Sequence, residues 1–285
     1  MFNLPGVRKK IPELKNLWAL NRGEITAVVG AGGKTGTMNL LAREFNYSGV
    51  VYTTTTAVLL PDDIPHRLEI VESLEDLQSS LRNYRNAVQS DQRSRRILVV
   101  GQKLQAAPPG SARPEKVLGL ESSWLSSLAG ELQDLKVLVE ADGAASHRIK
   151  APAEHEPVIP RLSDNLLVVQ GASALGRKLK SPHCFRADLV KNNQQISRRS
   201  KSLQPVRRRV SLKLYHQLFA GRPGYGGFLA NYSSSQLILS QCPDYFYKIC
   251  RRLNRELKQD LADIAEGFTA LNYERSLSIV YQERY

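Results

Sequence analysis

The stretch Gly30-Ala-Gly-Gly-Lys-Thr35 decides the fold of this chain through what precedes and follows it. Before it, Ile25-Thr-Ala-Val-Val29 is a short apolar run typical of a buried strand. After it, Met38, Leu41 and Phe45 recur at helical spacing and predict a helix from about 34 to 45. A glycine-rich turn between a strand and a helix is the arrangement with which many proteins hold phosphate groups.

Each residue type in this turn suits the binding of a phosphate chain. Glycines let backbone N–H groups come close to phosphate oxygens, and the following helix adds unpaired N–H groups and a partial positive charge. A lysine places a full charge on the terminal phosphates, and a threonine hydroxyl can ligate Mg²⁺. We therefore expect ATP or GTP, with Mg²⁺, to bind to Gly30, Ala31, Gly32, Gly33, Lys34 and Thr35.

The motif is shorter than the standard phosphate-binding pattern G-x-x-x-x-G-K-[ST]. Val28 stands where that pattern has its first glycine, which leaves G-x-x-G-K-T. Dinucleotide binding through G-x-G-x-x-G fits less well, because Thr35 occupies the place of the third glycine. A glycine-rich turn without a ligand is the alternative interpretation.

A second motif supplies carboxylates. Val137-Leu-Val-Glu140-Ala-Asp142-Gly143 is an apolar strand that ends in two acids at alternate positions, so both can point to one side. A phosphate-binding loop needs such a carboxylate on a neighbouring strand to hold or orient its metal ion. We expect Glu140 and Asp142 to be this acidic element, the alternative being that they only solvate the strand end.

Short apolar strands alternate with helical segments along the chain. Strands are expected at 50–53, 97–100, 137–140 and 166–169, with a further strand at 228–230. Helices are expected after Ser73-Leu-Glu-Asp76, over 120–133 and over 245–258, and residues 102–118 read as a loop. This alternation predicts one α/β domain over 1–285, a P-loop NTPase-like three-layer fold with a mostly parallel sheet.

On composition we expect a globular protein, and on its cysteines and N-terminus a cytoplasmic one. Apolar residues make up 42% and charged residues 24% of the 285 residues. Apolar runs such as Ile97–Val100 are far shorter than the roughly 20 residues of a membrane helix. Met1–Lys10 has no apolar region after its charges, so we expect no secretory signal. Three cysteines without a CxxC pattern predict a reduced protein.

The net charge of +13 is concentrated in one segment. Residues 177–213 contain twelve lysines and arginines and the single acid Asp188. We interpret them as a basic insertion or linker within the domain. An acidic protein surface, a nucleic acid or no partner at all are the alternatives, and the scarcity of aromatic residues for base stacking disfavours nucleic acid.

Residues 141–160 join two expected strands at the edge where ligands bind in such folds. In one interpretation Lys150 neutralises an anion while His155 or Glu154 moves protons. In another, His147, His155 and Glu156 hold a metal, although their spacing matches no standard set. A polar surface loop is the third. The run Thr53-Thr-Thr-Thr56 either presents hydroxyls to a phosphate or merely favours a strand.

Several of these motifs together resemble the YqeC family of selenium-dependent molybdenum hydroxylase accessory proteins. The resemblance covers roughly residues 22 to 190. It rests on the loop 30–35, the threonine run 53–56 and above all Glu140-Ala-Asp-Gly-Ala-Ala145 followed by Lys150-Ala-Pro-Ala-Glu-His-Glu-Pro-Val-Ile-Pro160. Arg186, in His183-Cys-Phe-Arg186, matches a further position.

The resemblance implies a P-loop-type fold, nucleotide binding and a role in the maturation of a molybdenum hydroxylase as client. It implies no particular reaction, so hydrolysis of the nucleotide and phosphoryl or nucleotidyl transfer both stay open. The chain departs from the family pattern at Gly36, where Thr or Ser is expected, and at Asn231-Tyr-Ser-Ser234, which lacks the Lys and Asp of a base-reading element.

Overall fold

The computed structural model describes residues 12–45, 49–61, 64–90, 97–107, 109, 115–128, 130–132, 134–190, 209–221, 224–272 and 278–285. Within them the main sheet consists of β1 (Ile25–Gly30), β2 (Val50–Thr54), β4 (Arg67–Ile70), β5 (Ile97–Gly101), β8 (Lys136–Glu140), β10 (Asn165–Gly171), β12 (Ser234–Ser240), β13 (Gly267–Asn272) and β14 (Ser278–Arg284). Their order is β14-β13-β12-β10-β1-β8-β2-β5-β4. All neighbours are parallel except β13 and β14, so the carboxyl ends of the other strands share one edge.

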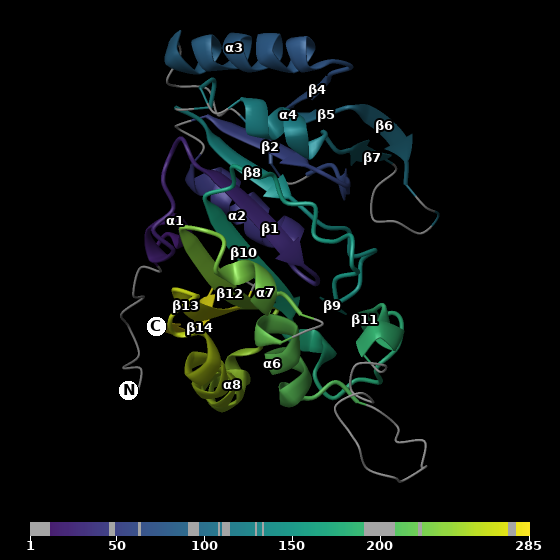
Figure 1. The fold of residues 1–285 in the computed structure, drawn as a ribbon, viewed down its shortest axis with the longest axis vertical. Helices are drawn as coiled ribbons and strands as arrows, with labels where there is room; N and C mark the ends of the chain where they lie inside the picture. Colours follow the sequence, from purple (N-terminus) through teal and green to yellow (C-terminus); the bar gives the residue numbers. More distant parts are fainter. Residues whose placement is uncertain are drawn as a thin grey trace.

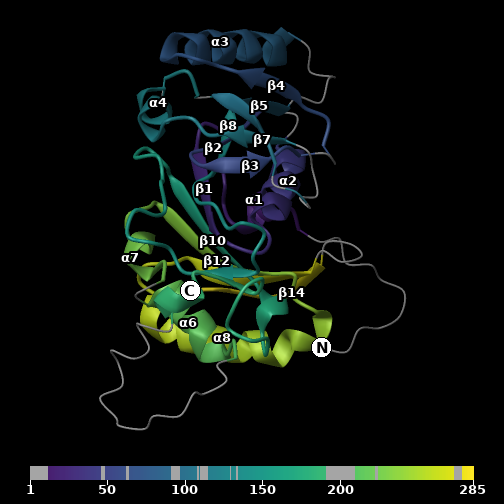
Figure 2. The same ribbon diagram turned by 90° about the vertical axis from the view of Figure 1, so that its right-hand side faces the viewer.

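Helices cover both faces of this sheet (Figures 1 and 2). α1 (Leu14–Leu17) and α2 (Lys34–Glu44) pack on one face. The other face is covered by α3 (Leu74–Ser90), α4 (Ser122–Ser127), α6 (Leu212–Ala220), α7 (Gly226–Leu229) and α8 (Tyr247–Leu261). Because side chains alternate along β1, Ala27 and Val29 join one core and Val28 joins the other. The expected mixed α/β fold with a mostly parallel sheet in three layers is confirmed.

Two small sheets stand at the carboxyl edge of the main one. The first has the order β3 (Ala57–Leu59), β7 (Glu115–Leu118), β6 (Lys103–Ala106), with antiparallel neighbours. Its strands β3 and β6 continue directly from β2 and β5. The second pairs β9 (Ile149–Lys150) in parallel with β11 (Cys184–Phe185). The turn that follows β1 leaves the main sheet at this same edge.

The strands expected at 25–29, 50–53, 97–100, 137–140 and 166–169 are confirmed, and so is the helix at 245–258 within small shifts of its ends. Ser73 Oγ accepts from the Asp76 N–H at 3.1 Å, as the capping pattern predicts. The chain after 259, for which the sequence predicted nothing, adds β13 and β14 to the sheet.

Three expectations were wrong. Residues 102–118 are not one loop but contain β6 and β7, and their prolines fall in the connection between the two strands. The strand expected at 228–230 is the end of α7, where Leu229 is apolar because it packs in a core. The strand lies instead at 234–240, where buried polar residues hide the apolar pattern. The helix expected over 120–133 extends only over Ser122–Ser127.

Candidate functional site

The turn after β1 has a backbone that only glycine adopts easily. Gly30, Gly32 and Gly33 have φ values of 99°, 70° and 144°. A Cβ on Gly30 would lie 1.9 Å from the Val169 carbonyl oxygen, and one on Gly32 would lie 2.2 Å from that of Arg148. The glycines are therefore required both by conformation and by the close approach of two neighbouring segments.

Hydrogen bonds determine which N–H groups of this loop can reach a ligand. Gly30 N–H donates to both carboxylate oxygens of Asp142 at 3.1 Å, and Ala31 N–H donates to the Val169 oxygen at 2.8 Å. Ser240 Oγ donates to the Gly32 oxygen. Because α2 begins at Lys34, its first N–H groups have no partner within the helix. The N–H groups from Gly32 to Thr35 therefore remain for an anion, since Thr37 N–H already donates to the Gly33 oxygen at 2.9 Å. Ala31, which is fully buried, anchors the loop.

Lys34 lies at the centre of the site and is 4% exposed. Its Nζ donates to the Gly30 oxygen at 2.7 Å and lies 3.6 Å from Glu140 Oε1 and 3.4 Å from Asp142 Oδ1. Burial acts to lower the pKa of Lys34, but the two carboxylates outweigh it and the pKa is raised. The ammonium group therefore stays charged over the physiological pH range.

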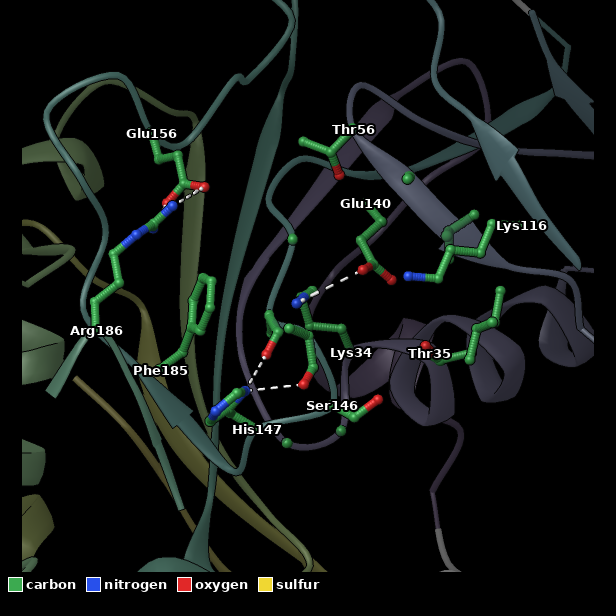
Figure 3. A pocket seen from close by; sticks show the side chains of 18 of the residues that line it. Lys34, Thr35, Thr56, Lys116, Glu140, Ser146, His147, Glu156, Phe185 and Arg186 are labelled. Atoms are coloured by element: carbon green, nitrogen blue, oxygen red, sulfur yellow. Dashed lines mark hydrogen bonds and ion pairs between the residues drawn. The ribbon is translucent and has the colours of Figure 1, made fainter. Parts of the chain in front are cut away.

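Of the two acids at the end of β8, Glu140 is the one that lines the pocket (Figure 3). Burial raises the pKa of its side chain, opposed mainly by Lys34. Among the described residues its Oε2 is one of the buried side-chain atoms without a hydrogen-bond partner. Thr35 lines the same pocket. A buried carboxylate oxygen without a donor and a nearby hydroxyl are oxygen ligands of the kind that Mg²⁺ prefers, so these residues fit the ion.

Asp142 lies beneath the loop, whereas Glu140 lines the pocket. It is fully buried and does not line the pocket. Besides the Gly30 N–H, it accepts a hydrogen bond from Tyr225 Oη at 2.6 Å and lies 3.3 Å from Lys150 Nζ. Its oxygens are therefore occupied by donors from three other segments. The two acids gather around Lys34 as expected, but Asp142 holds the loop and only Glu140 offers an oxygen to a ligand.

The pocket has a volume of about 570 Å³, within the range of ligand sites. Around it gather four non-glycine residues with left-handed backbone: Ala145 (φ 44°), Ser146 (φ 58°), Arg186 (φ 55°) and Gln241 (φ 50°). The described chain has one further such residue, Ala19. Strained backbone of this kind clusters at functional sites, where surrounding structure holds it in place.

A chain of alternating charges supports the pocket wall that carries Phe185 and Arg186. Lys150 is fully buried, donates to the Gly143 oxygen and lies 2.9 Å from Glu156 Oε2. Arg186 binds Glu156 through both guanidinium ends, with 3.0 Å between Nη2 and Oε1. The pairing of β9 with β11 brings Lys150 beside Phe185 and so sets Arg186 in reach of Glu156. Lys150 therefore organises the pocket without lining it.

Because Glu156 forms ion pairs, we expect the free energy of unfolding to change with pH in the acid range. Partial burial acts to raise the pKa of Glu156, but hydrogen bonds from Arg186 and Lys150 outweigh it and lower the pKa from 4.5 to about 2. A carboxyl with a depressed pKa stabilises the fold above its unfolded pKa and loses that effect as pH falls through the folded one.

We therefore expect wild type to exceed Glu156→Gln in free energy of unfolding above pH 4.5, with a difference that shrinks as pH falls to about 2. Urea denaturation of both proteins across this range measures it. A difference that stays constant over the range would contradict this assignment.

Of the other residues expected to act in the 141–160 segment, some line the pocket and some do not. Glu154 and His155 lie in an exposed turn and do not line the pocket, so His155 is not placed to act there. His147 does line it, and its Nδ1 faces the oxygens of Ala144 at 3.0 Å and Ala145 at 2.9 Å. In the part of the chain that is described, no three His, Cys, Asp or Glu residues are grouped to hold a metal. The structure thus does not support the expected metal set of His147, His155 and Glu156.

The threonine run is mostly structural. The hydroxyls of Thr53, Thr54 and Thr55 donate to backbone oxygens of Val100, Glu140 and Val158 at 2.8, 2.7 and 2.6 Å. Only Thr56 lines the pocket. These bonds tie the end of β2 to its neighbours and position the start of β3.

Sequence reasoning missed several pocket residues, namely Lys116, Ser146, Phe185 and Gln241, together with Ser240, which holds the loop. The candidate base-reading segment Asn231–Ser234 was wrongly placed, because it precedes β12 and so lies at the opposite edge of the sheet from the loop. The end of β12 at Ser240 carries the contact instead. A correct prediction of where β12 ends would have placed Ser240 and Gln241 at the loop.

Residues 191–208 of the expected 177–213 insertion lie outside the described residues. In its described part, Arg186 faces the pocket. The backbones of Lys178 and Arg209 pair in an isolated antiparallel β-bridge. Across the described ranges, no helix has the length and apolar character needed to span a membrane.

Comparison with known proteins agrees with the motifs. The model of the family described as YqeC protein matches residues 26–188, which include the loop, the acidic strand end and the Lys150 segment. The chain is 28% identical over 181 residues to the uncharacterized protein YqeC of Escherichia coli (strain K12), a match that spans 60% of this chain and 60% of that protein. No solved structure matches it. On the family match, which covers more than half of its length, this chain belongs to the YqeC family.

Proposed function

We propose that the pocket binds a nucleoside triphosphate together with Mg²⁺. One observation carries the proposal. The Gly30–Gly33 loop, Lys34 at the start of α2 and the unpartnered Oε2 of Glu140 converge on a single pocket of about 570 Å³. N–H groups at a helix start, a lysine and a carboxylate beside a threonine are the parts that phosphate and metal binding require.

The phosphates would lie against the N–H groups of Gly32 to Thr35. Lys34 has one neutral partner, the Gly30 oxygen, beside its two carboxylates. A phosphate oxygen is a stronger acceptor for an ammonium group than a carbonyl, so we expect it to replace the Gly30 oxygen. Lys34 would then contact the terminal phosphates while it keeps its contacts with Glu140 and Asp142.

Mg²⁺, when bound, would neutralise charge on the phosphate oxygens. Glu140 and Thr35 are the residues that would hold it, directly or through water, because both line the pocket. Asp142 would act only by fixing Gly30 and Lys34, since no part of it is exposed. This differs from the expectation that both acids ligate the ion.

On the family resemblance we further propose that the nucleotide is used in the maturation of a molybdenum hydroxylase. Either hydrolysis or transfer of a phosphoryl or nucleotidyl group is compatible with the pocket. The wall that carries His147, Phe185 and Arg186 is where a second substrate or client group would enter. The competing hypothesis is a nucleic-acid-binding or scaffold protein with a vestigial P-loop. It rests on Val28, Gly36 and the basic segment 177–213, of which residues 191–208 lie outside the described residues.

Calorimetric titration of ATP, GTP and CTP, each with Mg²⁺ and with EDTA, tests the proposal. We expect saturable binding of at least one nucleotide, weakened about tenfold or more by EDTA, because the ion offsets phosphate charge. In Glu140→Gln the effect of EDTA should largely disappear, since the amide keeps the size of the side chain but lacks its charge. Glu121→Gln, at the exposed start of α4, is the control and should behave like wild type.

Absence of saturable binding for all three nucleotides in the wild type would contradict the proposal. Binding that EDTA leaves unchanged would retain a nucleotide site but remove Mg²⁺ and the role of Glu140 from it.

A further inference from the structure

The small sheet β3-β7-β6 forms the wall of the pocket that faces the phosphate-binding loop. Lys116 lies in its central strand, between Leu59 of β3 and Gln105 of β6. Ala57, Val58, Leu59 and Lys116 all line the pocket. Figure 3 shows the Lys116 side chain extended into the pocket on the side of Glu140. A cation thus enters the site from a segment that none of the sequence motifs includes.

The charge of Lys116 is available, unlike that of the other pocket cations. Lys34 is paired with Glu140 and Asp142, and Arg186 is bound by Glu156. Lys116 is without an ion pair among the residues that the structure describes. An ammonium group that no carboxylate neutralises keeps its full attraction for an incoming anion.

The position of Lys116 is set by the main sheet. The N–H groups of Gly119 and Leu120, just after β7, donate to the oxygens of Thr56 and Thr54 at 2.8 Å each. Thr54 Oγ1 in turn donates to the backbone carbonyl oxygen of Glu140 at 2.7 Å. A Cβ on Gly119 would lie 2.4 Å from the Thr54 oxygen, so the two segments touch closely. Lys116 is therefore held at a defined place relative to Glu140, and such preorganisation favours binding.

We propose that Lys116 is a second phosphate-binding cation that makes the pocket prefer a nucleoside triphosphate over the diphosphate; this rests on the nucleotide binding proposed above. In phosphate-binding loops the lysine and the metal mark the end of the phosphate chain that carries the terminal phosphate. Lys116 stands at that end, beside Glu140 and across from Lys34. The terminal phosphate adds charge that a diphosphate lacks, and Lys116 is the cation left to meet it.

The test compares ATP with ADP, or GTP with GDP if the wild type prefers guanine, by calorimetry with Mg²⁺ on the full chain. In Lys116→Gln we expect triphosphate affinity to fall roughly tenfold or more and diphosphate affinity to change less than about threefold. Lys116→Arg, which keeps the charge, should restore most of the preference. Lys103→Gln is the matched control, because Lys103 lies exposed on β6 of the same sheet and does not line the pocket.

Equal losses for the two nucleotides in Lys116→Gln, or no loss for either, would overturn the inference while the proposed function stands. A wild type that binds neither nucleotide would overturn both, and this outcome is recognised without any variant. Thermal unfolding of each variant confirms that a lost affinity is not a lost fold.

Discussion

Lys34→Met is expected to lower the affinity for the Mg²⁺–nucleotide by about 100-fold or more. The substitution would remove the proposed charged hydrogen bond to a phosphate oxygen, worth about 1.5–3 kcal/mol, together with the charge attraction of a nearly buried ammonium group. It also leaves Glu140 and Asp142, previously 3.6 and 3.4 Å from Nζ, to repel the phosphates. Calorimetry with the nucleotide that wild type binds best measures the loss.

Lys248→Met provides the control for this prediction. Lys248 is an exposed lysine on α8, on a helix that does not contribute to the pocket. The Lys248→Met protein should bind nucleotide like wild type. A loss of affinity in Lys34→Met alone would then show that Lys34 belongs to the nucleotide site. Denaturation curves show whether Lys34→Met is folded at the assay temperature. A folded Lys34→Met protein with unchanged affinity would show that the loop does not hold the phosphates.

Asp142→Asn is expected to destabilise the protein by about 3–5 kcal/mol, because removal of one partner leaves buried charge uncompensated. Lys34 and Lys150 both lose the carboxylate that they share. The geometry adds a second reason. Both oxygens of Asp142 accept from the Gly30 N–H, and Oδ2 also accepts from Tyr225. An amide has one acceptor and two donors, so its NH₂ group must face other donors.

Differential scanning calorimetry of Asp142→Asn should show a lower melting temperature by roughly 10 °C, given the usual change of a few degrees for each kcal/mol in a chain of this size. The control is Asp260→Asn, because Asp260 also contacts a basic side chain, with Oδ2 2.9 Å from His216 Nε2, but is 57% exposed. An exposed pair contributes about 0–1 kcal/mol. Equal destabilisation by the two substitutions would contradict the role given to Asp142.

The features that could be predicted from sequence depend on contiguous residues. Strand, glycine turn and helix at 25–45 follow one another in the chain, so local pattern identifies them. Glu140 could be predicted because a parallel sheet brings the carboxyl ends of neighbouring strands to one edge, and β8 does pair with β1. For the same reason Lys34, Glu140 and Asp142 meet as expected.

The direction of side chains beyond the strand ends could not be predicted in this way. Alternation put Glu140 and Asp142 on one side, but β8 ends at Glu140, and the chain then turns so that Asp142 lies beneath the loop. His155 was expected in the site because of its chemistry, yet it lies in an exposed turn. Side chains alternate between the two faces with a period of two residues only as long as the strand continues.

By itself, then, the sequence determined the glycine-rich loop, the acidic strand end and the mostly parallel sheet, because each depends on local pattern and on the shared edge of parallel strands. Only the tertiary structure decided what surrounds them. Lys116, Arg186 and Gln241 reach the pocket from β7, from the residue after β11 and from the end of β12. Their meeting depends on which strands pair and in what register, which is set by long-range packing that no local pattern records.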